Sequence, residues 1–235
     1  MVDFHSHILP NMDDGADSTD CSINMLDIFS KQGVDTVVAT PHFYEEHETV
    51  AEFLKRRDIA YYNLNSQIKN SGIKCPEIVL GAEVALTPDI AKNADLEKLC
   101  IGKSNTILLE LPYSNFSEWM TYSIYEIISR WGLKPVLAHF ERFCFDKKML
   151  KQFESLLSLE LSVQINADSV LDRRLYKIVK HLAKNNLIDV LGSDAHNTDS
   201  RKSNFDLATE KITRKFGKQY IITLDCNARK LIDKY

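Results

Sequence analysis

The stretch Asp3-Phe-His-Ser-His7 joins a short apolar strand pattern to two histidines near the start of the chain. Side chains of an extended strand alternate between its two faces, so His5 and His7 project to the same side. Two imidazoles on one face at a strand end form half of a metal site, because neutral imidazole is a common metal ligand. The competing interpretation is a pair of incidental surface histidines, and the rest of the chain decides between the two.

Length and composition favour one globular α/β domain. The chain has 235 residues, and we expect them to form a single domain over residues 1–235. Apolar residues make up 44% of the chain, which is ordinary for a protein with a sizeable core. The net charge of −4 argues against a dedicated nucleic-acid-binding protein, which would be basic. The 5 cysteines are scattered without a Cys-x-x-Cys pair, which predicts reduced thiols packed as small hydrophobic groups.

The sequence contains no pattern of a targeting or membrane segment. Its first residues form a strand pattern and lack the basic and apolar regions of a signal peptide. No apolar run approaches the roughly 20 residues that a membrane-spanning helix needs. We therefore expect a cytoplasmic protein with no membrane insertion.

Short apolar or β-branched runs alternate with longer amphipathic stretches, which predicts βαβ units and a mainly parallel sheet. The predicted strands are residues 2–4, 36–40, 77–84, 107–111, 135–138, 162–165 and 190–192. The predicted helices are residues 22–32, 50–70, 118–131, 148–159, 173–185 and 205–216, followed by a last helix that begins at Asn227. About seven β-α units in one series favour a closed or nearly closed barrel, with a doubly wound open sheet as the alternative.

Titratable side chains recur at the predicted carboxyl ends of these strands, where the sites of both architectures lie. Glu83, Glu110, His139 and Asp194 each follow apolar or small residues, and charged groups are rarely buried unless they are paired or bound to metal. The other candidates are His5, His7, Asp14, His42 and His196.

The types and number of these candidates predict a cluster of two or three divalent ions. Imidazole and carboxylate without thiolate suit Zn²⁺, Mn²⁺ or Fe²⁺. Eight or nine candidates exceed the roughly four to six ligands of one ion, so a carboxylate is expected to bridge two ions. Two neighbouring ions clamp the attacking and leaving oxygens in phosphoryl hydrolysis and lower the pKa of bound water.

These motifs resemble those of the PHP (polymerase and histidinol phosphatase) superfamily. Within it, the chain is most similar to the bacterial capsule or exopolysaccharide tyrosine-protein phosphatases, the CpsB/YwqE group. The resemblance is carried by Asp3-Phe-His-Ser-His-Ile-Leu-Pro10, Asp13-Asp14-Gly15, Thr40-Pro-His42, Gly81-Ala-Glu83, Ala138-His139-x-Glu141-Arg142 and Asp194-Ala-His196-Asn197 with Arg201.

The resemblance implies a distorted (β/α)₇ TIM-like barrel of PHP type with metal ions at its C-terminal mouth. It implies three ligand sets: His5, His7, Glu83 and Asp194; a bridging Glu83 with Glu110 and His139; and Asp14, His42 and His196. Arg142 and Arg201 would bind the phosphate, and a protonated His42 or one metal would assist the leaving oxygen. Manganese is the expected metal, with iron, cobalt or zinc as alternatives.

The substrate that the resemblance implies is phosphotyrosine, typically in the C-terminal tail of a membrane-associated tyrosine kinase that controls polysaccharide export. Three other interpretations stay open: another PHP phosphoesterase such as a histidinol-phosphate phosphatase, a metal-dependent amidohydrolase, and a non-catalytic metal-binding partner of the kinase system. The basic helix 50–70 is either a solvated face or the interface of a homo-oligomer. Tyr113, Phe116 and Trp119 could stack on an aryl substrate, but packing in the core or at the rim is the interpretation we favour.

Overall fold

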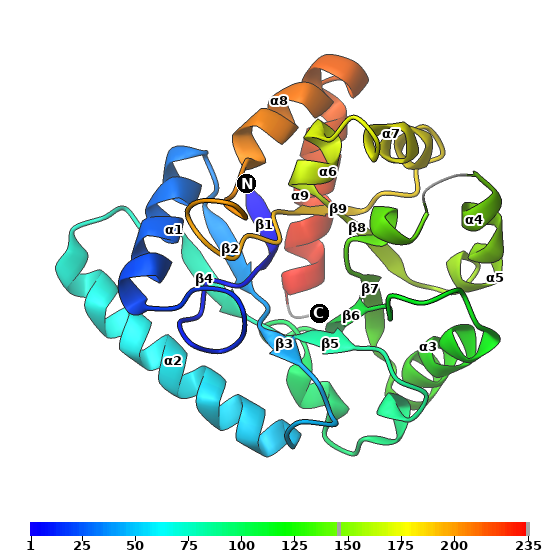
Figure 1. Cartoon of the computed structure of the whole chain (residues 1–235), viewed down its shortest axis with the longest axis horizontal. Coiled ribbons are helices and arrows are strands. Elements are labelled where there is room, and N and C mark those ends of the chain that lie inside the picture. The colour runs from blue at the N-terminus through cyan, green and yellow to red at the C-terminus, as the bar shows by residue number, and fades with distance from the viewer. Residues whose placement is uncertain (145–146, 234–235) are drawn as a thin grey trace.

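A computed structural model describes residues 1–144 and 147–233 as a strongly curled parallel sheet surrounded by helices (Figure 1). The strands are β1 Val2–Ser6, β2 Thr36–Ala39, β3 His42–Phe43, β4 Glu77–Leu80, β5 Glu83–Ala85, β6 Thr106–Glu110, β7 Lys134–Leu137, β8 Ser162–Asn166 and β9 Val190–Gly192. Their pairing gives one sheet in the order β1-β2-β4 and another in the order β3-β5-β6-β7-β8-β9.

The two sheets form a barrel because each continues into the other along the chain. Two residues separate β2 from β3, and two separate β4 from β5. A parallel bridge pairs Ser6 with Ala195, and the amide of Asp194 donates to His5 O at 2.8 Å, so β9 meets β1. The predicted distorted (β/α)₇ barrel is therefore confirmed.

The predicted strand 77–84 is wrong as a single strand, because it is interrupted at Gly81. Pro41, between β2 and β3, has no N–H to donate to a ladder, and the pairing shifts around it. The amide of Gly81 donates to Ala39 O at 2.8 Å, whereas the amide of Glu83 donates to Pro41 O at 3.0 Å. Arg57 then satisfies the carbonyl of Gly81 through Nη1 at 3.0 Å, so this arginine is buried and does not belong to a solvated face.

The helices mostly follow the predicted ranges. They are α1 Thr19–Lys31, α2 Val50–Ser71, α3 Glu118–Trp131, α4 Lys147–Gln152, α5 Glu154–Leu157, α6 Ala167–Leu171, α7 Tyr176–Lys184, α8 Phe205–Phe216 and α9 Lys218–Ile232. Short 3₁₀ helices span Ile90–Lys92, Leu96–Leu99 and Phe140–Phe143. The predicted helix 148–159 is divided into α4 and α5, and α6 was not predicted.

The predicted start of the last helix at Asn227 is wrong. Gly217, with φ of 89°, makes the turn between α8 and α9, so the last helix begins at Lys218 without a linker. Asn227 lies inside α9, where its Nδ2 donates to Asp189 O at 3.2 Å. A good N-capping residue was therefore misread as a helix start when its side chain serves a tertiary contact.

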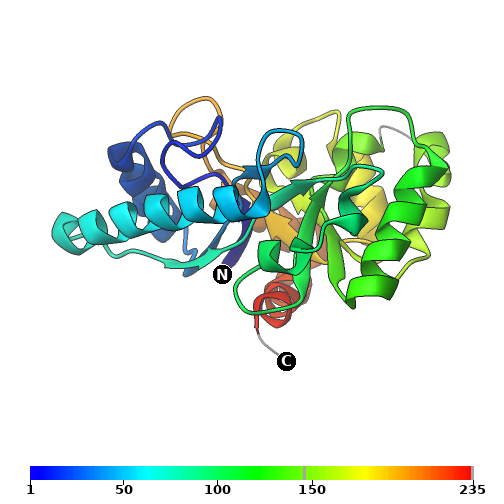
Figure 2. The same ribbon diagram turned by 90° about the horizontal axis from the view of Figure 1, so that it is seen from below.

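Helix α9 covers one end of the barrel and leaves the other end open. Phe4, Val38, Leu108 and Val136 form an apolar cluster of strand residues, and Ala228 of α9 packs in the same cluster. Figure 2 shows α9 beneath the strands, on the side opposite the loops that follow them. The site at the carboxyl ends of the strands is thus the uncovered end. Within the described ranges, no helix combines the length and apolar content required to cross a bilayer.

Candidate metal centre

The nine predicted ligand side chains lie close together at the carboxyl ends of the strands. β1 supplies His5 and, just past its end, His7, and the loop that follows supplies Asp14. The remaining candidates come from β3 (His42), β5 (Glu83), β6 (Glu110), the end of β7 (His139) and the segment after β9 (Asp194 and His196). Parallel strands bring their carboxyl ends to one edge, which explains why residues so far apart in sequence meet.

The most buried part of the centre contains two histidines and two carboxylates. His5 Nε2 and His7 Nε2 are 3.1 Å apart, and Glu83 Oε2 lies 3.1 and 3.3 Å from them, respectively. Asp194 Oδ1 completes the group at 3.7 and 3.4 Å from the same nitrogens. Four ligand atoms therefore face one small volume.

The other oxygen of Glu83 faces a second group. Glu83 Oε1 lies 2.9 Å from His139 Nε2, and Glu110 Oε1 lies 3.5 Å from that nitrogen. His42 Nδ1 is near both carboxylates, at 3.1 Å from Glu83 Oε2 and 3.8 Å from Glu110 Oε2. Glu83 thus connects the two groups, as a bridging carboxylate would.

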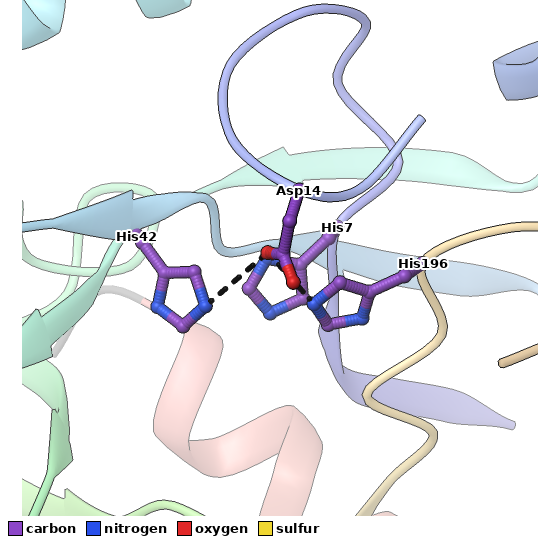
Figure 3. A group of neighbouring side chains, drawn as sticks. All are labelled: His7, Asp14, His42 and His196. Atoms are coloured by element: carbon purple, nitrogen blue, oxygen red, sulfur yellow. Dashed lines mark ion pairs between the residues drawn. The ribbon is translucent and has the colours of Figure 1, made fainter. Parts of the chain in front are cut away.

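A third group lies nearer the solvent (Figure 3). Asp14 Oδ1 is 3.3 Å from His196 Nε2 and 3.7 Å from His42 Nε2. The ring of His7 stacks on that of His196 with 3.9 Å between centroids. Asp14 is exposed whereas His7 and His196 are buried, so the loop carboxylate covers the histidines from the solvent side.

The donor set fits divalent metal ions. Glu83 Oε2, His42 Nδ1 and His196 Nε2 are buried and make no well-oriented hydrogen bond to any described residue, although the first two lie 3.1 Å apart. Leaving such atoms unpaired is costly, and a cation at the centre removes that cost. Nitrogen and carboxylate oxygen donors without sulfur suit manganese, iron, cobalt or zinc.

The charges of the centre lower the pKa values of two of its carboxylates. Burial by itself would raise the pKa of Glu83, but His5, His139 and His7 hold it well below the usual range. Burial would likewise raise the pKa of Asp194, and His5, His7 and Arg142 lower it. Ionised carboxylates are the form that binds a metal ion.

The pKa values of His139 and His196 shift in opposite directions. Burial would lower the pKa of His139, but Glu110 and Glu83 raise it to about 9. Burial and the positive charge of His7 lower the pKa of His196 to about 4. A proton and a metal ion would therefore compete for His139, whereas the lowered pKa of His196 favours its neutral form at neutral pH.

Asp13, which the sequence analysis left without a role, orients two of the candidate ligands. Its Oδ2 lies 2.7 Å from His7 Nδ1 and accepts from the amide of His42 at 2.8 Å. Its Oδ1 accepts from the amide of Gly15 at 2.9 Å. A carboxylate at Nδ1 places the proton there, so Nε2 of His7 is free to face the centre. The only sequence signal for this role was its position beside Asp14.

Gln164 and Asn166 on β8 were also missed as supporting residues. Gln164 Oε1 lies 3.1 Å from His5 Nδ1 and accepts from the amide of His139 at 2.8 Å. Gln164 Nε2 donates to Asn166 Oδ1 at 2.8 Å, and Asn166 Nδ2 donates to Asp194 Oδ2 at 2.9 Å. Their i, i+2 spacing at a strand end was the available signal, but uncharged amides did not stand out as ligands.

Two of the candidate ligands have left-handed backbone conformations. His139 has φ of 32° and Asp194 has φ of 54°. Such values are uncommon for residues other than glycine, and they cluster at functional sites where the surroundings compensate for the strain. The backbone turns at these residues direct both side chains toward the centre instead of continuing the strand.

Arg142 and Arg201, predicted to bind the phosphate, flank the centre. Arg142 Nη2 donates to Asp194 Oδ2 at 2.7 Å, and its Nη1 donates to Tyr113 Oη at 3.3 Å. Arg201 Nη1 donates to Asp14 Oδ2 at 3.0 Å, and its Nη2 lies 3.4 Å from Asp194 Oδ1. Both line a cavity of about 460 Å³ that also contacts six of the nine candidate ligands.

The comparisons with known proteins agree with this architecture. The family described as "Capsular polysaccharide synthesis, CpsB/CapC" matches residues 1–233. The tyrosine-protein phosphatase YwqE of Bacillus subtilis is 28% identical over 99% of this chain and 91% of its own length. The tyrosine-protein phosphatase CpsB of Streptococcus pneumoniae is 30% identical over 92% of this chain and 91% of its own.

Solved structures show the same likeness. The fold matches a structure reported for YwqE from Bacillus subtilis and CpsB from Streptococcus pneumoniae, described as unique metal-dependent tyrosine phosphatases. That match has a TM-score of 0.83 and 26% identity, and covers 99% of this chain and 94% of the other. An Escherichia coli phosphotriesterase homology protein matches at a TM-score of 0.60 and 11% identity over 99% of this chain and 98% of its own, which shows the fold alone. With the family match over residues 1–233, the chain belongs to the CpsB/CapC family of capsular polysaccharide synthesis.

Proposed function

We propose that this chain is a metal-dependent protein-tyrosine phosphatase. The observation that carries the proposal is a centre of nine imidazole and carboxylate side chains, linked through Glu83, with Arg142 and Arg201 at its rim. The relatives in the same family are named tyrosine-protein phosphatases, and one structural match is described as metal-dependent.

We propose three ligand sets, and the short distances between their donor atoms support them. His5, His7, Glu83 and Asp194 would hold one ion, Glu83 with Glu110 and His139 a second, and Asp14, His42 and His196 a third. Manganese is the metal we propose, with iron, cobalt or zinc as alternatives. When bound, such ions supply positive charge for the phosphate oxygens and lower the pKa of water to make a nucleophile.

The chain's own residues would then position the phosphate and shield the reaction. Arg142 and Arg201 each present a planar guanidinium that can bind two phosphate oxygens at once. Arg142 pairs with Asp194 and Arg201 pairs with Asp14, so phosphate binding would exchange a carboxylate partner for a phosphate partner. Cations bound to the phosphate in this way would stabilise the charge that builds up during phosphoryl transfer.

His42 has two proposed roles. Its ring nitrogens lie 3.1 Å from Glu83 Oε2 and 3.7 Å from Asp14 Oδ1, which supports a ligand role between two groups. Its assistance to the departing tyrosyl oxygen stays a prediction. The tyrosine phenol has a pKa of about 10, so its phenolate is a tolerable leaving group. A modest degree of proton donation from His42 to the departing oxygen would therefore suffice.

The substrate that we propose is phosphotyrosine in the C-terminal tail of a membrane-associated tyrosine kinase. The support is the family's link to capsular polysaccharide synthesis and the names of its members. Such a tail lies in the cytoplasm, which is the location we propose for the enzyme. A homo-oligomer formed through the outer face of α2 stays a prediction.

The test compares a phosphotyrosyl peptide with a phosphoseryl peptide, histidinol phosphate and a phosphodiester, using protein stripped of metal and reloaded with Mn²⁺. We expect phosphotyrosine turnover that disappears with chelator and survives thiol alkylation. Preferred turnover of histidinol phosphate or the diester would overturn the substrate but keep the metal centre. No turnover at full metal loading would favour a binding protein over an enzyme.

The variant Arg142→Ala tests the phosphate-binding role. We expect a large fall in kcat with little change in bound metal, because the Arg142 side chain donates to Asp194 Oδ2 but supplies no ligand atom itself. Unchanged turnover in this variant would remove Arg142 from the mechanism.

A further inference from the structure

The cavity of about 460 Å³ at the metal centre is called the catalytic cavity. A second cavity, of about 630 Å³, adjoins it. Tyr113 and Arg142 line both, so the two cavities share one wall. The remainder of the second cavity is lined mainly by Phe116, Phe143, Phe153 and Leu175. We call it the aromatic cavity. None of its lining residues within the described ranges is acidic, whereas the catalytic cavity contains several carboxylates.

The aromatic cavity is formed by side chains that hold one another in place. Phe116 and Phe153 make an edge-to-face contact with 5.0 Å between centroids, and Tyr113 lies 5.4 Å from Phe143. Phe143 and Phe153 are 5% and 2% exposed and form its floor. Such aromatic contacts fix the shape of the surface, so a ligand would meet a largely preformed apolar site.

Tyr113 separates the two cavities. Its side chain is 69% exposed, so it lies at the rim instead of in the core. The ring lies parallel to His139 with 6.3 Å between centroids, and its hydroxyl accepts from Arg142 Nη1 at 3.3 Å. The arginine proposed to bind the phosphate therefore also anchors the wall of the aromatic cavity.

We infer that the aromatic cavity binds an apolar side chain next to the phosphotyrosine of the substrate polypeptide. This inference rests on the proposed function. An extended chain advances about 3.3 Å per residue, so a residue one to three positions from the phosphotyrosine reaches a cavity across a shared wall. The aromatic and aliphatic lining favours a leucine- or phenylalanine-like side chain. A carboxylate there would lose much of its hydration, and the one cation of the described lining, Arg142, already donates to Tyr113 and Asp194.

The first experiment compares three substrates on metal-loaded enzyme: phosphotyrosine itself, a phosphotyrosyl peptide with flanking leucines, and the same peptide with flanking aspartates. We expect kcat/KM for the leucine peptide to exceed that for the aspartate peptide by about tenfold, mainly through KM. Phosphotyrosine serves as the internal control because it does not reach the aromatic cavity. Equal values for the two peptides would overturn the inference.

Two variants locate the effect. Phe116→Ala should lower kcat/KM for the leucine peptide about tenfold and leave phosphotyrosine unchanged. Leu175→Asp should reverse the preference toward a peptide with flanking lysines, a gain that damage to the fold would not produce. The matched control is Leu207→Ala, because Leu207 is 50% exposed on α8, away from both cavities. Equal losses on phosphotyrosine and on the leucine peptide would refute the role of this cavity.

A binding measurement separates this inference from the proposed function. Loss of all phosphotyrosine turnover in the unmodified, metal-loaded protein would overturn the phosphatase assignment. Calorimetric titration with the leucine peptide would still test the cavity, since the expected affinity depends on Phe116 and Leu175 and not on turnover. Binding that is unaffected by both variants would refute the inference even if the enzyme hydrolyses phosphotyrosine.

Discussion

Asp13→Asn tests whether the centre depends on residues that do not bind metal themselves. Asparagine keeps the size of the side chain but loses the charge and one acceptor oxygen. If the side-chain oxygen of the new asparagine stays near His7 and His42, its NH₂ group faces the backbone N–H of Gly15. Two hydrogen-bond donors then oppose each other. The substitution therefore weakens the contact that fixes the ring of His7 and disturbs the loop that carries Asp14.

The contacts of Asp13 set the expected loss of Mn²⁺ affinity. The 2.7 Å contact between His7 and Asp13 is charge-assisted, and such a hydrogen bond contributes about 1.5–3 kcal/mol. Residues that orient metal-binding histidines typically change affinity by roughly 10- to 100-fold, which equals about 1.4–2.8 kcal/mol. The two figures agree, so we expect Mn²⁺ affinity to fall about 10- to 100-fold. A domain stable by roughly 5–15 kcal/mol should remain folded.

The assay is Mn²⁺ affinity measured by competition with a chelator, together with the metal content of the purified protein. Asp17→Asn is the matched control, because Asp17 is exposed in the same loop and its side chain accepts a hydrogen bond from neighbouring Ser18. An affinity for Asp13→Asn within twofold of the control would refute the orienting role. Weaker binding restored by excess Mn²⁺, with full turnover at saturation, would support it.

Three further outcomes follow from the structure. Gln164→Leu should reduce both the free energy of unfolding and the Mn²⁺ affinity, because His5 Nδ1 and the amide of His139 lose their acceptor. Each buried group left unpaired should cost about 1–3 kcal/mol. Urea unfolding and metal titration measure the two effects. Gly192→Ala should lower the stability of the fold more than an ordinary surface substitution does, because the new Cβ would lie 2.6 Å from His5 Cβ. Expression level and thermal unfolding measure this loss. Burial alone would raise the pKa of Asp35, but hydrogen bonds from its cationic neighbours lower it to about 2. The stabilisation from this lowered pKa is present above the ordinary pKa of about 4 and disappears as the pH falls through about 2. In urea unfolding, Asp35→Asn should therefore be less stable than wild type at pH 7, and the difference should shrink as the pH falls toward about 2.

The sequence predicted much of the barrel because its signals are local. Runs such as residues 107–111 and 190–192 are apolar, short and bounded by helix patterns, and both are strands in the structure. The errors arose where tertiary contacts override local preference. Gly81 interrupts a strand because Pro41 lies between the neighbouring strands β2 and β3, and Asn227 lies mid-helix because it bonds to Asp189. Neither partner could be identified from a window of adjacent residues.

The candidate ligands could be found from the sequence because buried titratable groups at strand ends are unusual. Their supporting residues could not be found in the same way. Asp13, Gln164 and Asn166 are recognised only by what they contact. These contacts range from His7 with Asp13, 6 residues apart, to His5 with Gln164, 159 residues apart. The sequence does not show which histidine nitrogen an amide or carboxylate side chain will face.

By itself, the sequence determined the order of strands and helices, the edge at which the titratable groups meet, and the type of metal that they suit. These follow from the periodicity of the chain and from the donor atoms of its side chains. Only the tertiary structure decided that Glu83 faces two groups of histidines, that Arg142 joins the centre to Tyr113, and that an aromatic cavity lies beyond them. The physical reason is that strand order and donor chemistry are local properties, whereas distances between side chains depend on how the whole barrel closes.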